Sequence, residues 1–415
     1  MNRKHLCAAA ALSAALITGT TGCSAKATAG ATTPSSAAAA TPGVTRTTIT
    51  LGALTDLSGP AASLGKPALQ AEQIYLDDVN AAGGVCGRQV EVLAQDNGYD
   101  VQKAVTEYTG MQPKIALMSQ LIGSPETDAL LDGIERDKLP TLPSGPASAL
   151  LNHPHIQVVG ATYDINMVNG MDFLVKAAAL KSGDKVGMVF QPGEYGNDVE
   201  AGAKFVAAKY GVSLVEQQVS PTATDLTAQV TALKAAKVKA IVFAGTPPQT
   251  ASLVGVAAAG GLRVPVLASG PGYVSQLLAT PAAPALEKML YVTSGTPALS
   301  STDPAITRLV KEYTAKYPAD QLGVAVQVGA YSADISVAAL KASCDDLTRD
   351  GITKGLRSLT AFDDGIVGPE DFSDPAKASD TRTYILQPAA GVPGGLKTVQ
   401  DAATSPLVAQ YLAAK

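Results

Sequence analysis

Thr48-Ile49-Thr50-Leu51-Gly52-Ala53-Leu54 alternates polar residues with β-branched or aliphatic ones, which is the pattern of a β-strand. Leu57-Ser58-Gly59-Pro60 breaks this strand, and residues 66–80 then carry apolar side chains at helical spacing. Ala82-Gly83-Gly84 ends the helix, and residues 89–94 supply the next strand. A strand, a helix and a strand in this order predict a βαβ unit whose two strands are parallel.

The same alternation repeats along most of the chain. Further strands are expected at residues 115–118, 139–142, 185–190, 212–217, 240–244, 264–268 and 383–386. Helices are expected at residues 101–111, 198–210, 225–236, 250–259 and 326–343, and another begins at Ser124-Pro125, with Ser124 as the N-cap. The alternation falls into two runs, with a boundary near residues 160–168. We therefore predict an α/β fold of two Rossmann-like lobes, each with a parallel central sheet.

The first residues are typical of an exported protein. Residues 3–5 are basic, and residues 6–17 form an apolar run that suits a secretory signal peptide and is too short to span a bilayer. Thr20-Thr21-Gly22-Cys23 resembles the lipobox of bacterial lipoproteins, although Thr20 stands where Leu, Val or Ile is usual. We expect a signal peptide at residues 1–22 and lipidation of Cys23. The alternative is an ordinary signal peptide followed by an incidental cysteine.

The stretch after Cys23 has the composition of a tether. Residues 23–46 are rich in Ala, Thr, Ser, Gly and Pro and have almost no large apolar side chain. A lipid-anchored, flexible segment of this kind would hold the rest of the protein at the outer face of the cell membrane.

The chain has four cysteines. Cys7 lies in the signal peptide and Cys23 in the lipobox, which leaves Cys86 and Cys344. In an oxidising compartment two remaining thiols predict one disulfide, with two buried free thiols as the alternative. A metal site built on this pair is a weaker interpretation, because no histidine lies near either cysteine in the sequence.

Charge and motifs exclude several classes of protein. There are 31 Lys and Arg against 36 Asp and Glu, a net charge of −5, and no Trp, which argues against a nucleic-acid partner. No segment after residue 25 has eighteen or more uninterrupted apolar residues, so a polytopic membrane protein is excluded. There is no Walker loop, no G-x-S-x-G elbow and no H-E-x-x-H, so we expect neither an enzyme nor a cofactor.

Two local patterns contain residue types that could form a metal site or a carboxylate pair. His153 and His155 flank Pro154, but no cysteine or carboxylate cluster accompanies them in the sequence, so no metal site is expected. Asp96 and Asp100 have the spacing of a carboxylate pair, and we interpret them as solvated acids in a loop after a strand.

Two stretches carry a resemblance to a known family: Leu57-Ser58-Gly59-Pro60-Ala61-Ala62, and residues 78–88 with the sequence DVNAAGGVCGR. Several shorter motifs follow in matching order, namely Gly123-Ser124, Tyr195-Gly196, Asp225-Leu226, Leu233-Lys234, Gly261-Leu262 and Gly329-Ala330-Tyr331. With these residues the chain resembles, over about residues 48–390, the extracytoplasmic solute-binding proteins of ABC importers. The group is the one that binds branched-chain amino acids (Leu/Ile/Val).

The resemblance implies an architecture and partners. Two α/β lobes would be joined by a hinge of three crossovers and would close on a small-molecule ligand held in the cleft between them. Residues 47–165 with 295–362 would form lobe one, and residues 166–294 with 363–415 would form lobe two. An ABC permease and its ATPase would be the partners, and Cys86 and Cys344 would both lie in lobe one.

The resemblance also implies binding residues. Ser124 matches a serine at a strand–helix junction that binds the ligand carboxylate, and a helix N-terminus suits an anion. Gly145 matches a backbone contact in the second carboxylate-binding loop. Ala147 stands where a Thr hydroxyl is expected, so Ser148 or Ser144 would have to replace it. Tyr195 and Tyr331 match aromatic walls of the cleft, and Leu64 stands where many relatives have an aromatic lid. For each residue a purely structural role is the alternative.

Two departures bear on the ligand. Pro271 stands where amino-acid binders have an acid for the ligand ammonium, and Pro247 replaces a nearby Tyr. Because a buried ammonium without a charged partner is costly, either Glu194 or another acid compensates or the ligand is not an α-amino acid. We expect a small carboxylate, amide or other polar solute, held by hydroxyls and Gln249 with Tyr273 as a wall.

Three classes of function remain open. The first is a transport-linked binding lipoprotein, and the second is a ligand sensor that reports to a membrane receptor. The third is an enzyme on a Rossmann-like scaffold. Fold by itself does not separate them.

Overall fold

The structure is a computed structural model that describes residues 41–318 and 322–415. The expected signal peptide at 1–22, the lipidation of Cys23 and the tether as far as residue 40 lie outside these residues. Within the described ranges, every helix is too short or too polar to cross a membrane.

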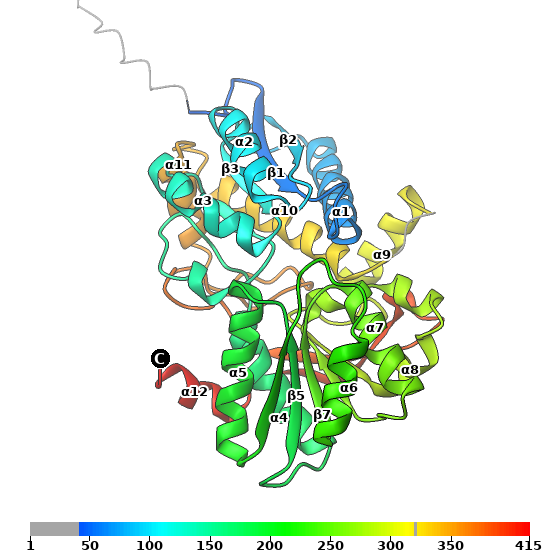
Figure 1. The fold of residues 1–415 in the computed structure, drawn as a ribbon. Helices are drawn as coiled ribbons and strands as arrows, with labels where there is room; N and C mark the ends of the chain where they lie inside the picture. Colours follow the sequence, from blue (N-terminus) through cyan, green and yellow to red (C-terminus); the bar gives the residue numbers. More distant parts are fainter. Residues whose placement is uncertain (1–40, 319–321) are drawn as a thin grey trace, which may run out of the picture. The chain divides into compact units, whose positions relative to one another are not determined.

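The chain builds two sheets (Figure 1). The first is four-stranded and entirely parallel, in the order β2 (Gln89–Asp96), β1 (Thr48–Thr55), β3 (Leu117–Leu121) and β4 (Thr141–Pro143). Residues 51–55 of β1 are all buried, as expected for a central parallel strand that is covered on both faces. Its helices are α1 (Ala62–Ala81), α2 (Val101–Met111), α3 (Ser124–Asp137), α10 (Val324–Ala342) and α11 (Arg349–Arg357).

The second sheet has seven strands. Its order is β11 (Leu396–Ala403), β10 (Thr383–Pro388), β9 (Leu290–Ser294), β8 (Val266–Ala268), β7 (Ala240–Ala244), β5 (Lys185–Phe190) and β6 (Ser213–Gln218). The expectation of purely parallel sheets is wrong for β10, which runs antiparallel to both β9 and β11. The remaining helices are α4 (Tyr163–Ala177), α5 (Glu194–Tyr210), α6 (Thr227–Ala236), α7 (Pro247–Ala259), α8 (Ala283–Met289), α9 (Pro304–Lys316) and α12 (Pro406–Leu412).

The chain passes between the two sheets three times. It leaves the first sheet after β4, returns from β9 to α10, and leaves again between α11 and β10. The predicted α/β class with two lobes is therefore confirmed. The expected division into lobes stays a prediction, and Phe372, from the 363–415 segment assigned to lobe two, packs with Leu142, Ile335 and Leu356 of the first lobe.

The start of α3 also differs from the prediction. Gly123 is the N-cap, with a φ of +104°, and Ser124 is the first helical residue. The Ser124 side chain is therefore not needed to cap its own helix, which matters for the site below.

Cys86 and Cys344 form a disulfide, one of the arrangements that the cysteine count left open. Cys86 lies in the turn after α1, and Cys344 follows the end of α10. These two helices share an apolar cluster over the first sheet that includes Leu76, Val337 and Leu340. The bond closes a loop of 258 residues in sequence separation and so restricts the unfolded chain strongly.

We expect the double variant Cys86→Ala, Cys344→Ala to lose about 2–5 kcal/mol of unfolding free energy, because the unfolded chain regains the entropy of a long loop. Urea unfolding followed by circular dichroism measures the loss. Oxidised and reduced wild-type protein are the controls, and reduced wild type should match the variant. An unchanged urea midpoint in both would contradict a stabilising role for the bond.

Candidate functional site

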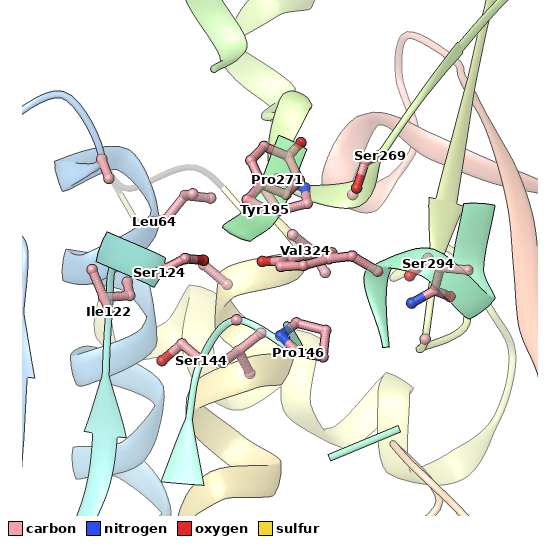
Figure 2. Close-up of a pocket in the computed structure, with 18 of the residues that line it drawn as sticks. Leu64, Ile122, Ser124, Ser144, Pro146, Tyr195, Ser269, Pro271, Ser294 and Val324 are labelled. Carbon is pink, nitrogen blue, oxygen red and sulfur yellow. The ribbon is translucent and has the colours of Figure 1, made fainter. Parts of the chain in front are cut away.

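A cavity of about 200 Å³ lies where loops from both sheets meet (Figure 2). Almost every one of these loops follows the carboxyl end of a parallel strand, which is where open α/β sheets bind ligands. The lining loops are residues 60–61 after β1, 122–124 after β3, 144–146 after β4, 245–247 after β7, 269–271 after β8 and 293–296 after β9.

One end of the cavity is built for an anion. Ser124 begins the fourteen-residue helix α3, whose first backbone N–H groups have no partner within the helix. Ser144 lies beside it, and its buried Oγ has no hydrogen-bond partner among the described residues. Gly145 follows, and a Cβ there would lie 2.9 Å from the Tyr163 hydroxyl and 3.4 Å from Ser124 Oγ. The Ser124 and Tyr163 hydroxyls therefore converge on the Gly145 backbone, with Ser144 in the adjoining wall.

A buried acid lies close to this end without facing the cavity. Glu126, in the first turn of α3, folds back over Gly123, and its Oε2 has no hydrogen-bond partner among the described residues. Burial raises the pKa of Glu126, and the nearby Asp56 and Asp100 raise it further. This shift favours the neutral carboxyl, which weakens its repulsion of an anion at the helix N-terminus.

Tyrosines form much of the remaining polar lining. Tyr99, Tyr163, Tyr195 and Tyr331 all line the cavity, and the rings of Tyr163 and Tyr195 lie 4.7 Å apart between centroids. Burial raises the pKa of Tyr99 to about 12 and that of the other three further. The four hydroxyls thus stay protonated at neutral pH and can donate hydrogen bonds.

Much of the remaining lining is apolar, and no Asp, Glu, Lys, Arg or His among the described residues lines the cavity. The further polar residues in the wall are Asn166, Gln191, Thr246, Ser269, Thr293, Ser294 and Thr296. Pro271 and Pro247 are both in the wall, at the positions where an acid and a tyrosine were expected. Glu194 does not reach the cavity, so it does not compensate for the missing acid. The site therefore offers hydroxyls and backbone groups without a countercharge.

The structure places four of the seven predicted ligand residues in the wall: Ser124, Gly145, Tyr195 and Tyr331. Leu64 also lines it. Their contact with a ligand stays a prediction. Sequence reasoning missed Tyr99 and Tyr163. Tyr99 could have been found, because it lies five positions after the end of a predicted strand, residues 89–94, at the edge of the sheet where sites form.

The other three predicted ligand residues do not line this cavity, and each of their side chains has a structural role. Gln249 is fully buried and completes the capping box of α7 with Thr246, while its Nε2 donates to the Ser220 and Ala223 carbonyls. Tyr273 donates its hydroxyl to the Gly395 carbonyl, 2.7 Å away. Ser148 donates from Oγ to Asp198, 2.7 Å away, and its backbone N–H also donates to that carboxyl group.

The two histidines belong to a different environment. His155 Nδ1 lies 2.6 Å from Glu135 Oε2, and His153 Nδ1 lies 4.0 Å from the other oxygen of the same carboxylate. Across residues 41–318 and 322–415, no group of three His, Cys, Asp or Glu side chains is placed to hold a metal ion.

Fold and site together define a two-lobed protein that binds a small molecule between α/β lobes. Residues 48–392 match the model of the periplasmic binding protein family, and the chain belongs to this family. The predicted family is thereby confirmed.

Known relatives extend this result. A solved fatty acid ABC transporter substrate-binding protein from Thermomonospora curvata is 41% identical, with a TM-score of 0.88 over 89% of this chain and 96% of that one. A branched chain amino acid ABC transporter protein from Thermus thermophilus, solved with bound valine, is 22% identical, with a TM-score of 0.76 over 88% of this chain and 98% of that one. This second likeness shows the fold alone.

Among curated proteins, the Leu/Ile/Val-binding protein BraC3 of Rhizobium johnstonii is 24% identical over 212 residues. That match covers 48% of this chain and 55% of the relative, so it spans about half the length of each.

Substitutions of two serines, Ser144 and Ser148, test ligand binding and stability separately. We expect Ser144→Ala to weaken binding of a carboxylate ligand about tenfold to a hundredfold, because a hydrogen bond to a charged group is lost. The ligand-free protein should keep its stability, since this hydroxyl has no partner in the described residues. Isothermal titration calorimetry and urea unfolding measure the two effects.

Ser148→Ala is the matched control. It removes a hydrogen bond to the buried Asp198 and should lower the unfolding free energy by about 1–2 kcal/mol with little change in affinity. Equal losses of affinity in both variants would contradict the assignment of Ser144 to the anion end.

Proposed function

We propose that the protein captures a small carboxylate with an apolar body in this cavity and delivers it to an ABC permease and its ATPase. The observation that carries the proposal is the lining: hydroxyls and a helix N-terminus lie at one end, and apolar side chains such as Leu64, Ile122 and Val328 line much of the cavity beside further hydroxyls and amides. Hydroxyls and free N–H groups bind a carboxylate, while an apolar wall binds hydrocarbon.

The same lining argues against an α-amino acid. An ammonium group in the cavity would leave water without meeting a charged partner, which costs several kcal/mol. Pro271 and Pro247 supply neither a charge nor a donor at the two places where amino-acid binding proteins of this family were expected to have polar groups. Deaminated acids avoid this cost.

The relative from Thermomonospora curvata supports this ligand class. Its title names a fatty acid transporter, and at 41% identity over nearly its whole length it is a much nearer relative than the two proteins above that are named for branched-chain amino acids.

The lining also supports binding without turnover. Its serine and tyrosine hydroxyls have no histidine, lysine or carboxylate beside them in the cavity wall to act as a general base. We therefore propose a transport protein and not an enzyme.

Two pairs of ligands that differ only in the ammonium group test the proposal: leucine with isocaproate, and valine with isovalerate. The protein is first unfolded and refolded to strip bound solute, and affinities are measured by isothermal titration calorimetry. We expect each deaminated acid to bind at least about a hundredfold more tightly than its amino acid, because the cavity has no partner for the ammonium. Tighter binding of the amino acids would refute the assigned ligand class.

Pro271→Asp sharpens this test, with Pro271→Asn as the uncharged control. The Asp variant should gain affinity for leucine and lose affinity for isocaproate, because it adds a negative charge to the wall. The Asn variant should do neither. Equal behaviour of the two variants would mean that charge at this position does not select the ligand.

We also propose that Cys23 is lipidated and anchors the protein outside the cell membrane. The supporting observation is the Thr20-Thr21-Gly22-Cys23 motif after an apolar run. In cells that express the full chain, Cys23→Ala should move the protein from the membrane fraction to the soluble extracytoplasmic fraction, because two acyl chains provide the attachment. Cys7→Ala is the control and should leave the distribution unchanged, and membrane retention of the Cys23 variant would exclude this anchor.

A further inference from the structure

A second, smaller cavity lies directly behind the wall of the first. Its volume is about 20 Å³, and it shares four wall residues with the main cavity: Gly270, Thr293, Ser294 and Val324. In Figure 2, Ser294 lies on the side of the main cavity opposite Ser124 and Ser144, with Val324 between them. The smaller cavity therefore lies at the end away from the proposed carboxylate site.

The deeper lining of this second cavity is apolar. It consists mainly of Val292, Ala298, Leu299, Leu386 and Leu396, from the two strands next to β10, from β10 itself and from the segment after β9. All five side chains are buried. A volume of about 20 Å³ admits one water-sized group, which is also the size of a terminal methyl.

Polar atoms in the lining are already engaged by the protein. Gln327 Nε2 donates to the Pro297 carbonyl at 2.9 Å, and the Tyr273 hydroxyl donates to the Gly395 carbonyl at 2.7 Å. Ser294 Oγ donates to the Thr296 carbonyl at 2.8 Å. A buried water needs two to four polar partners, so this cavity suits hydrocarbon better than water.

The partition between the two cavities is thin. Gly270 contributes no side chain to it, and Val324 contributes a single short one from the first turn of α10. A rotation of the Val324 side chain is a small change compared with a backbone movement.

We propose that the second cavity receives the far end of the ligand's hydrocarbon chain and sets the longest straight-chain monocarboxylate that binds tightly. This inference rests on the proposed function, because the carboxylate must lie at Ser124 and Ser144 for the chain to point toward Val324. The smaller cavity then limits the length of the hydrocarbon chain that binds tightly, and we call it the chain-length gauge.

Hexanoate, octanoate, decanoate and dodecanoate are the probes, measured by calorimetry on the refolded wild-type protein. Affinity should rise about fourfold for each methylene buried until the chain end fills the second cavity, and then stop rising. Ala298→Val partly fills that cavity, so affinity should stop rising at a shorter chain. The variant should bind hexanoate as tightly as wild type does. It should bind the longest acid that wild type binds tightly about fourfold to tenfold more weakly than wild type does.

Leu396→Ala tests the opposite direction. It enlarges the second cavity, so affinity should keep rising to a longer chain than in wild type. A variant that had merely lost its fold would not gain affinity for longer acids. Ala257→Val and Leu286→Ala are matched controls, because both sites are fully buried in the same apolar cluster and line neither cavity. Both controls should keep the wild-type profile.

The outcomes separate the two proposals. Wild-type protein that binds none of these acids nor the deaminated acids above overturns the proposed function, and the chain-length gauge with it. Wild-type protein that binds them with one unchanged length profile in all four variants keeps the proposed function and overturns the gauge alone.

Discussion

The constraint on which the site depends is the direction of the parallel strands. Because connections between parallel strands are made by helices, all the strand carboxyl ends of a sheet meet along one edge, and the loops after them gather there. Here loops after β1, β3 and β4 of one sheet and after β7, β8 and β9 of the other supply most of the cavity wall. Residues as far apart in sequence as Pro60 and Thr296 line one cavity for this reason.

Holding an anion without a cation requires that other charges be kept away. The α3 N-terminus supplies a partial positive charge, and the unpartnered Ser144 hydroxyl and the protonated tyrosines supply donors. Glu126 opposes this arrangement to the extent that it is ionised, and burial raises its pKa. The resulting site disfavours ligands that carry a positive group, because no acidic side chain among the described residues lines the cavity and could pair with that group.

Local patterning predicted the fold well and the site in part. The strand at 48–54 and the helix at 101–111 were visible because periodicity is a local property, and β1 and α2 lie there. Strand β11 was missed, since its residues are largely exposed and have no apolar period. The structural roles of Gln249 and Tyr273 were not visible in the sequence, because a polar side chain near a loop can serve either a ligand or the protein's own backbone. Only their three-dimensional partners, Thr246 and Gly395, decide between these roles.

Ligand capture by closure requires that the free energy of lobe movement be small compared with that of binding. The contact between Ser148 and Asp198, from the loop after β4 to α5, consists of hydrogen bonds that water can replace when the lobes separate. Burial raises the pKa of Asp198 to about 6, so near neutral pH its carboxylate is mostly ionised and would be well hydrated if the contact opened. Apolar side chains beside this contact, including Leu150 and Val199, also pack in one cluster, so the lobes meet through apolar as well as polar groups. Both lobes contribute wall residues to the cavity, so a bound ligand adds contacts to each of them.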